Sequence, residues 1–185
     1  VIERGWDLPM ATGNRLRESI ASNKGIWLMH MLRYLMFDTN TRTSPNFYKF
    51  VRELSLAANS RQFSNADFIR LAEKHHGAPL AKFFEQWLYG YGMPEFNVEY
   101  TFSQREGSYY IDGKVITKKV DTDFEMPVVM RVELKGNSSE ESLYFRENVK
   151  APESQFTLGP FDTEPKKFTF NEFFSVLSQD KVSKK

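Results

Sequence analysis

The segment from Leu80 to Phe96 constrains the fold most, because the spacing of its apolar residues changes from helical to extended. Before the change, apolar residues recur every three or four positions, at Leu80, Phe83, Phe84, Trp87 and Leu88. After it they alternate, at Phe96, Val98, Tyr100 and Phe102. The intervening sequence, residues 90–94, contains two glycines and a proline that cannot continue a helix. The sequence therefore predicts helices before this junction and strands after it.

About four helices are expected in residues 1–92, after an irregular lead-in over residues 1–20 that shows no sustained period. The first helix is expected over residues 22–37, where apolar residues form two neighbouring rows. The second follows the pair Ser44-Pro45 and has an apolar stripe made of Phe47, Phe50, Val51 and Leu54. The third opens at Ser64, has Asp67 at capping-box spacing and ends at Gly77, and the fourth begins at Pro79.

The residues after the junction favour short strands separated by turns. Alternating patterns predict strands at 96–102, 111–117 and 128–134, and shorter segments follow at 143–145, 156–158 and 168–170. Such spacing is typical of a small antiparallel sandwich. The expected fold is therefore α+β, with a helical subdomain over residues 1–92, a β-sandwich domain over 93–176 and a solvated tail over 177–185.

Composition excludes several classes of protein. The 185 residues are 41% hydrophobic, which is enough for a sizeable core, and 25 Lys and Arg against 24 Asp and Glu give a net charge of +1. So balanced a charge does not favour nucleic acid as a partner. There is no cysteine, and the longest apolar run, residues 26–29, is too short to span a membrane. Because the first residue is Val1 rather than Met, we expect a piece of a longer polypeptide.

The three histidines, His30, His75 and His76, do not match a zinc-binding pattern. Zinc hydrolysis requires two histidines one helical turn apart with a glutamate between them, H-E-x-x-H. His75 and His76 are adjacent and point about 100° apart on a helix, so we interpret them as basic residues that complement the helix dipole. His30 is interpreted as a core or boundary residue.

Other catalytic patterns are missing as well. The sequence contains no G-x-S-x-G elbow, no Walker A motif and no dinucleotide-binding glycine pattern. A pair of catalytic carboxylates is left open at this point, because acidic residues are plentiful. From the residues alone we predict no catalytic, cofactor-binding or metal-binding residue in this chain.

Three segments of the helical half form a recognisable series of motifs. The first is Lys24-Gly25 followed by Met31-Leu32-Arg33. The second is Asp67-Phe68 with Glu73 and Gly77, and the third is Phe83-Phe84-Glu85-Gln86-Trp87 followed by Gly92-Met93-Pro94. In this order the three segments resemble the end of the catalytic domain of aminopeptidase N-like zinc metallopeptidases, which are gluzincins of the thermolysin-like type. The likeness covers residues 13–135, because a β-sandwich domain follows these helices in the family.

This resemblance implies a C-terminal portion of a metallopeptidase that lies downstream of its metal site. Zinc would then be a cofactor of the full-length parent, whose upstream catalytic portion would be the partner of this chain and whose substrate would be a peptide. The family's H-E-x-x-H motif and third ligand are absent from this sequence. Family members also carry an oxyanion-binding tyrosine two residues before the Lys-Gly pair, where this sequence has Ser22.

Two readings follow for the function. Under the first, the chain supports a catalytic domain encoded upstream and is not catalytic by itself. Under the second, it is a stand-alone protein-interaction module or part of an inactive peptidase homologue. A large exposed apolar patch on the chain is expected under the first reading, and a fully polar surface under the second.

Overall fold

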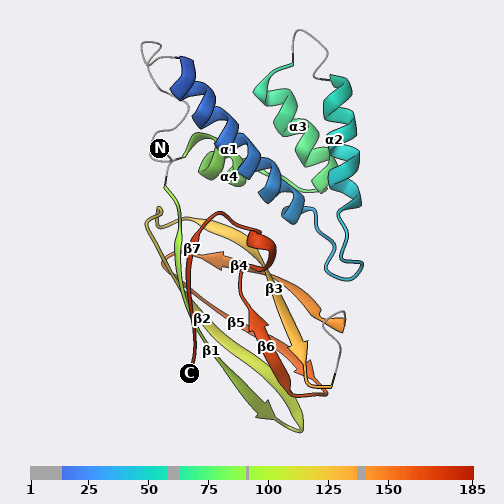
Figure 1. Ribbon diagram of the computed structural model, residues 1–185, viewed down its shortest axis with the longest axis vertical. Helices are drawn as coiled ribbons and strands as arrows, with labels where there is room; N and C mark the ends of the chain where they lie inside the picture. The colour runs from blue at the N-terminus through green and yellow to red at the C-terminus, as the bar shows by residue number, and fades with distance from the viewer. Residues whose placement is uncertain (1–13, 58–62, 91, 137–140) are drawn as a thin grey trace. The chain divides into compact units, whose positions relative to one another are not determined.

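The computed structural model describes residues 14–57, 63–90, 92–136 and 141–185, with side chains described from Lys24 onward. The chain forms two compact units, Val1–Gly92 and Met93–Lys185, which we call the helical unit and the sandwich unit. The expected α+β class is confirmed, because helices occupy the first unit and two sheets occupy the second (Figure 1).

The described residues of the helical unit form three long helices and a short final one. Their bounds are α1 Asn14–Leu35, α2 Pro45–Ala57, α3 Asn65–His76 and α4 Ala81–Phe84, which continues as a π-helix, η1, over Glu85–Tyr89. The expected irregular lead-in over residues 1–20 is wrong from Asn14 onward, where α1 already begins; residues 1–13 lie outside the described residues. Polar sequences form helices readily when they continue into a segment that is anchored by packing.

The core of the helical unit is aromatic and aliphatic. Helix α2 contributes the fully buried Phe50, whose ring lies 5.6 Å from that of Phe68 on α3, and Phe68 in turn lies 5.8 Å from Phe84. Helix α3 also buries Leu71 and Ala72. Further buried apolar residues come from α1 and from the last helices, among them Leu28, Met31, Leu32, Phe83, Trp87 and Leu88. The apolar residues that recur every three or four positions in the sequence thus form the inward faces of α1 and of α4 with η1.

The sandwich unit contains two sheets, of which one has the strand order β5-β2-β1-β7 and the other β4-β3-β6. The strands are β1 Glu95–Arg105, β2 Ser108–Lys118, β3 Glu125–Leu134, β4 Leu143–Lys150, β5 Glu153–Phe161, β6 Pro165–Thr169 and β7 Gln179–Lys184, with a 3-10 helix, η3, at Glu172–Phe174. Aromatic rings fill the space between the sheets: Phe168 of β6 lies 4.8 Å from Tyr100 of β1 and 5.6 Å from Phe156 of β5.

The C-terminal residues form a strand, so the expected tail over residues 177–185 is wrong. Strand β7 pairs in parallel with β1, from Glu95 opposite Gln179 to Tyr100 opposite Lys184 (Figure 1). Every residue of β7 is exposed, so backbone hydrogen bonds rather than apolar burial hold it in the sheet. The sandwich is therefore antiparallel except for this one pair.

Gly113 has a packing role in β2. The ring of Phe156 on the neighbouring strand β5 lies directly against Gly113, in the space that a Cβ atom would need. An aromatic side chain that covers a cross-strand glycine replaces the packing that the glycine lacks. The glycine is thus a condition for the aromatic core and not a break in the strand.

Candidate functional site

Lys24, the first residue of the Lys-Gly pair, joins the middle of α1 to the end of the last helix. Its Nζ donates to the carbonyl oxygens of Gly90, at 2.9 Å, and of Leu88, at 3.3 Å. Carbonyls in the last turn of a helix lack partners within the helix, so an ammonium group there satisfies them and complements the dipole. Partial burial at this position lowers the pKa of Lys24.

Gly90 allows the chain to leave the π-helix at this point. Its N–H donates to the Glu85 carbonyl at 2.8 Å, which is the bond that widens the helix by one residue. A Cβ atom on Gly90 would overlap the backbone carbonyl of Gln86. Lys24 and Gly90 therefore define the end of the helical unit together, from positions 66 residues apart.

The residues of the second motif hold the ends of α3 and α4. Ser64 and Asp67 form a reciprocal capping box at the start of α3, and Gly77 ends that helix in the left-handed conformation with φ of 86°. Glu73 Oε1 accepts a hydrogen bond of 2.9 Å from the backbone N–H of Leu80, the N-cap residue of α4. The motif residues thus fasten helices to one another.

The three histidines lie in three different environments. His30 lies between the rings of Trp27, at 5.4 Å, and Tyr34, at 4.9 Å. His76 Nδ1 lies 3.3 Å from the carbonyl oxygen of Ala78, while His75 Nε2 lies 2.9 Å from a carboxylate oxygen of Glu53 on α2. Within the described residues, no group of three or more His, Cys, Asp or Glu side chains is placed to hold a metal ion.

A groove of about 480 Å³ opens between α2 and α3. Its lining comprises Pro45, Tyr48, Lys49, Arg52, Glu53 and Leu56 from α2 and His75 from α3. The analysis of the sequence did not predict this groove, because it considered only one apolar stripe of α2. The signal that could have revealed it is the second set of apolar residues, Tyr48 and Leu56, which lies outside that stripe.

Glu53 is the carboxylate of the groove, and Lys74 and His75 hold it. Lys74 Nζ lies 2.6 and 2.9 Å from its two oxygens, and His75 lies 2.9 Å away. Hydrogen bonds from Lys74 and then from His75 lower the pKa of Glu53, so it stays ionised and is a weak base at neutral pH. The described lining has no Ser, Thr or Cys nucleophile. The groove thus presents apolar and charged side chains together.

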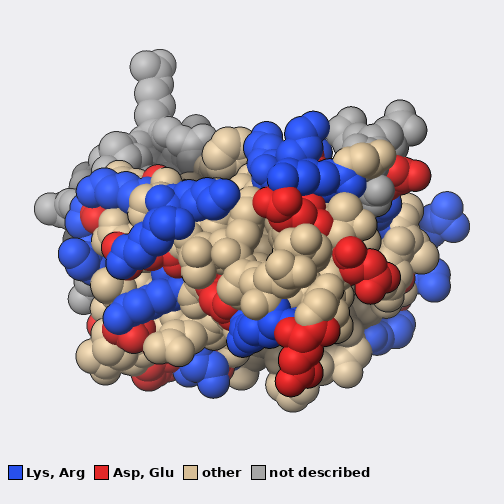
Figure 2. Space-filling model, turned by 90° about the horizontal axis from the view of Figure 1, so that it is seen from below, with Lys and Arg blue, Asp and Glu red and all other residues tan. Residues whose placement is uncertain are grey.

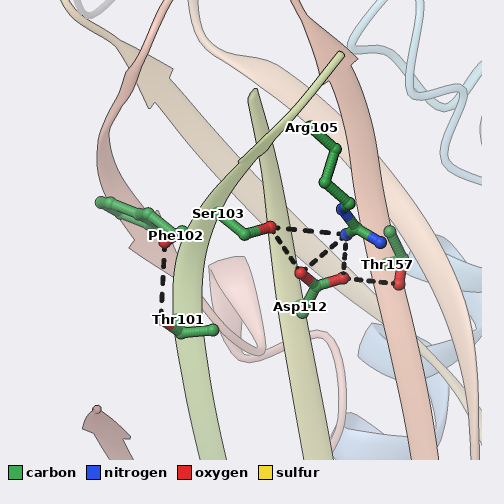
Figure 3. A network of polar contacts seen from close by, with 6 residues as sticks. All are labelled: Thr101, Phe102, Ser103, Arg105, Asp112 and Thr157. Carbon is green, nitrogen blue, oxygen red and sulfur yellow. Dashed lines mark hydrogen bonds and ion pairs between the residues drawn. The ribbon is translucent and has the colours of Figure 1, made fainter. Parts of the chain in front are cut away.

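The sandwich unit carries a polar cluster around Asp112 that spans three strands (Figure 3). Asp112 on β2 accepts hydrogen bonds from Ser103 at 2.6 Å and Arg105 at 2.5 Å, both on β1, and from Thr157 on β5 at 2.9 Å. Partial burial alone would raise the pKa of Asp112, yet these three donors outweigh it and lower the pKa. The guanidinium of Arg105 also lies 4.4 Å from the ring centre of Tyr110. The cluster joins neighbouring strands and leaves the carboxylate fully engaged.

Charged side chains of both signs are distributed over the surface. On the face seen in Figure 2, Lys and Arg lie among Asp and Glu, with uncharged residues between them. Pairs such as Lys114 with Glu153, at 2.7 Å, and Lys185 with Glu99, at 2.5 Å, account for part of this mixing in the sandwich unit. None of the helices that the structure describes combines the length and apolar character that a bilayer crossing requires.

Comparison with known proteins gives a structural likeness without a sequence family. No family model matches the sequence, and none of the curated proteins matches it. Among solved structures, the chain resembles aminopeptidase A of Legionella pneumophila, solved in complex with aspartic acid, with a TM-score of 0.70 and 19% identity. The match covers 98% of this chain and 20% of that one. The chain therefore has an aminopeptidase-like fold, and it spans about a fifth of the length of that enzyme.

Proposed function

We propose that this chain is the C-terminal part of the catalytic domain, with the adjoining β-sandwich, of an aminopeptidase N-like zinc metallopeptidase of the gluzincin type. The observation that carries the proposal is the structural likeness over 98% of the chain to an aminopeptidase. The positions of the motif residues support it, because Lys24, Glu73 and Gly77 each serve to end or join helices. Any chain with this helical arrangement needs residues that end and join the helices in this way.

In this proposal the chain supports catalysis that occurs elsewhere in the parent. The sequence has no H-E-x-x-H motif, and the described residues offer no set of donors that fits a zinc ion. Zinc and the peptide substrate would be bound by the upstream catalytic portion of the same polypeptide. The role of this chain would be to fix the frame against which that portion is built.

Ser22 bears on whether the parent is active. Its position is where related enzymes carry a tyrosine that stabilises the oxyanion, and a serine side chain is too short to replace it from the same backbone. The side chain of Ser22 lies outside the described residues. An inactive homologue is therefore the second candidate within the peptidase family.

The groove between α2 and α3 bears on the candidate outside the family, a protein-interaction module, for which a fully polar surface was expected. Tyr48 and Leu56 are 58% and 71% exposed, which is high for large apolar side chains on one helix face. This observation is compatible with a binding function either in a peptidase or on its own.

The proposal is tested on the polypeptide that carries this segment in its source organism. We would capture it with an antibody raised against the 185-residue chain, identify its full sequence by mass spectrometry, and measure its zinc content and its hydrolysis of aminoacyl chromogenic substrates. We expect an upstream H-E-x-x-H motif, one zinc per chain and turnover that a chelator abolishes. A captured polypeptide without that motif contradicts the proposal, and one with the motif and zinc but no turnover identifies an inactive homologue.

A further inference from the structure

The outward face of α2 combines apolar and basic side chains. Tyr48, Lys49, Arg52 and Leu56 recur at helical spacing and line the groove together, whereas Phe50 on the opposite face is fully buried. A solvent-facing helix surface is ordinarily polar, and single apolar residues on it need no explanation. Here two large apolar residues, Tyr48 and Leu56, lie about two helical turns apart in the lining of one groove, and two cations lie between them in the sequence.

The cations of this face lack carboxylate partners among the described residues. Neither Lys49 nor Arg52 takes part in any of the ion pairs, and the groove's own carboxylate, Glu53, is already bound by Lys74 and His75. Arg33 on α1 adds a third positive charge, with its guanidinium 5.9 Å from the ring centre of Tyr48. The Nε of Arg33 is buried and has no hydrogen-bond acceptor. The groove therefore has an excess of positive charge that the described residues do not neutralise.

We propose that this groove is a docking site for an extended, acidic segment of a partner protein, whose apolar side chains cover Tyr48 and Leu56. Eight residues along a helix separate these two by about 12 Å. An extended chain covers that distance in about four residues, at about 3.3 Å per residue. The matching segment thus has apolar residues four positions apart and, midway between them on the same side of the extended chain, a carboxylate that faces Lys49 and Arg52.

Charge and shape both favour this occupant over a polynucleotide. A phosphate backbone would satisfy Lys49 and Arg52, but it brings no aliphatic group to cover Leu56. The charge of the whole chain, +1, also provides no long-range attraction for a polyanion. The proposal is independent of the peptidase assignment, because it rests on the groove alone.

A labelled peptide tests the proposal on the full 185-residue chain. The probe is the pentapeptide LDEDL with fluorescein on its N-terminal amine and an amidated C-terminus, and its matched control is LNQNL with the same two end groups, which has the same shape without the side-chain charges. Fluorescence anisotropy measures the Kd of each. We expect saturable binding of LDEDL that weakens as salt is added, because exposed ion pairs are screened. Binding of LNQNL is expected to be at least roughly fivefold weaker, since two exposed charge pairs are lost.

Substitutions place the binding in the groove. The double variant Lys49→Gln with Arg52→Gln removes both cations from an exposed surface, and we expect a rise in Kd of roughly fivefold or more. Its control is Lys166→Gln with Lys167→Gln, which removes the same charge from exposed positions on β6, and we expect an unchanged Kd. Leu56→Gln is expected to weaken both peptides.

Three results would overturn the proposal. One is the absence of saturable binding of LDEDL. Another is equal binding of LDEDL and LNQNL, which would remove the role of charge. The third is an equal loss of affinity in the groove variant and in the β6 control, which would reduce the effect to net charge. Circular dichroism of each variant verifies that the fold is intact.

Discussion

Single side chains define where the helical unit ends, and Lys24 is the clearest of them. Its two hydrogen bonds reach carbonyls of the last helix at Leu88 and Gly90. Replacing Lys24 by Met keeps the apolar stem and removes the donors, so we expect the free energy of unfolding to fall by about 1 to 3 kcal/mol. Urea denaturation followed by tryptophan fluorescence measures this. An unchanged midpoint would show that water replaces the ammonium group at no cost.

Two glycines of the helical unit are expected to respond in opposite directions to alanine. Gly25 lies inside α1, and nothing is within 4 Å of where its Cβ would lie, so Gly25→Ala should stabilise the protein by about 1 kcal/mol. Gly90→Ala places a methyl group against the Gln86 carbonyl and should cost about 1 to 3 kcal/mol. The same denaturation series compares the two variants, and a shift of equal sign in both would contradict this assignment.

The sequence allowed local helix caps to be predicted, but not the hydrogen-bond partners of residues that are distant in the chain. The capping box at Ser64 and the αL end at Gly77 were predictable because both depend on residues within one turn. The pair of His75 and Glu53 joins positions 22 residues apart, and the bond of Lys24 to Gly90 joins positions 66 apart. No local pattern encodes such separations. Tyr48 and Leu56 could have indicated a second apolar face on α2, but the contribution of His75 to the groove depends on α2 and α3 lying side by side.

At the level of elements, the alternation of apolar and polar residues located the strands that bury side chains. It missed β7, which buries no side chain. The clearest alternation, in β3, corresponds to buried residues such as Val128, Met130 and Val132. Strand β7 has one large apolar residue, Val182, which is 44% exposed. Backbone hydrogen bonds with β1 hold this strand in the sheet, and such bonds do not depend on a pattern of apolar side chains.

Removal of β7 tests whether it stabilises the sandwich unit. A chain that ends at Ser178 loses the parallel ladder with β1 and the bond from Asn171 Nδ2 to Asp180, so we expect a lower urea midpoint. The exposed edge of β1 should also increase aggregation, which light scattering measures. Removal of Lys185 alone is the control and should have a much smaller effect. An unchanged midpoint after removal of β7 would restore the interpretation of residues 177–185 as a solvated tail.

The stability that the pairing of β7 with β1 gives the fold should depend on pH through the ionisation of Glu95. Hydrogen bonds from Lys119 and then from Lys181 of β7 lower the pKa of Glu95 from 4.5 to about 2. A pKa that is lower in the folded state stabilises the fold above the unfolded value of 4.5, and this stabilisation is lost as pH falls through 4.5 towards 2. The difference in urea midpoint between the wild type and Glu95→Gln should therefore shrink over this interval. A constant difference would exclude the ion pairs as its cause.

For the whole molecule, the α+β class was predictable because one junction separates apolar residues at helical spacing from apolar residues that alternate.

What the isolated chain does chemically remains a prediction from its residue types. Purified without added metal, the 185-residue chain should contain no stoichiometric zinc and should leave aminoacyl chromogenic substrates intact, since three dispersed histidines cannot replace an H-E-x-x-H site. Elemental analysis and a chromogenic assay measure both. One zinc per chain, or turnover that a chelator abolishes, would reveal a site that both the sequence and the structure have missed.

The parallel pairing of β7 with β1 determines how the sandwich unit responds to mechanical tension. Strand β1 starts just after Met93, and β7 runs alongside it in the same direction to Lys184. A force that pulls Met93 and Lys185 apart therefore slides the two strands past each other, and all the bonds of the ladder share the load. In an antiparallel pair joined to the same two points, the bonds would open one after another, as in a zipper.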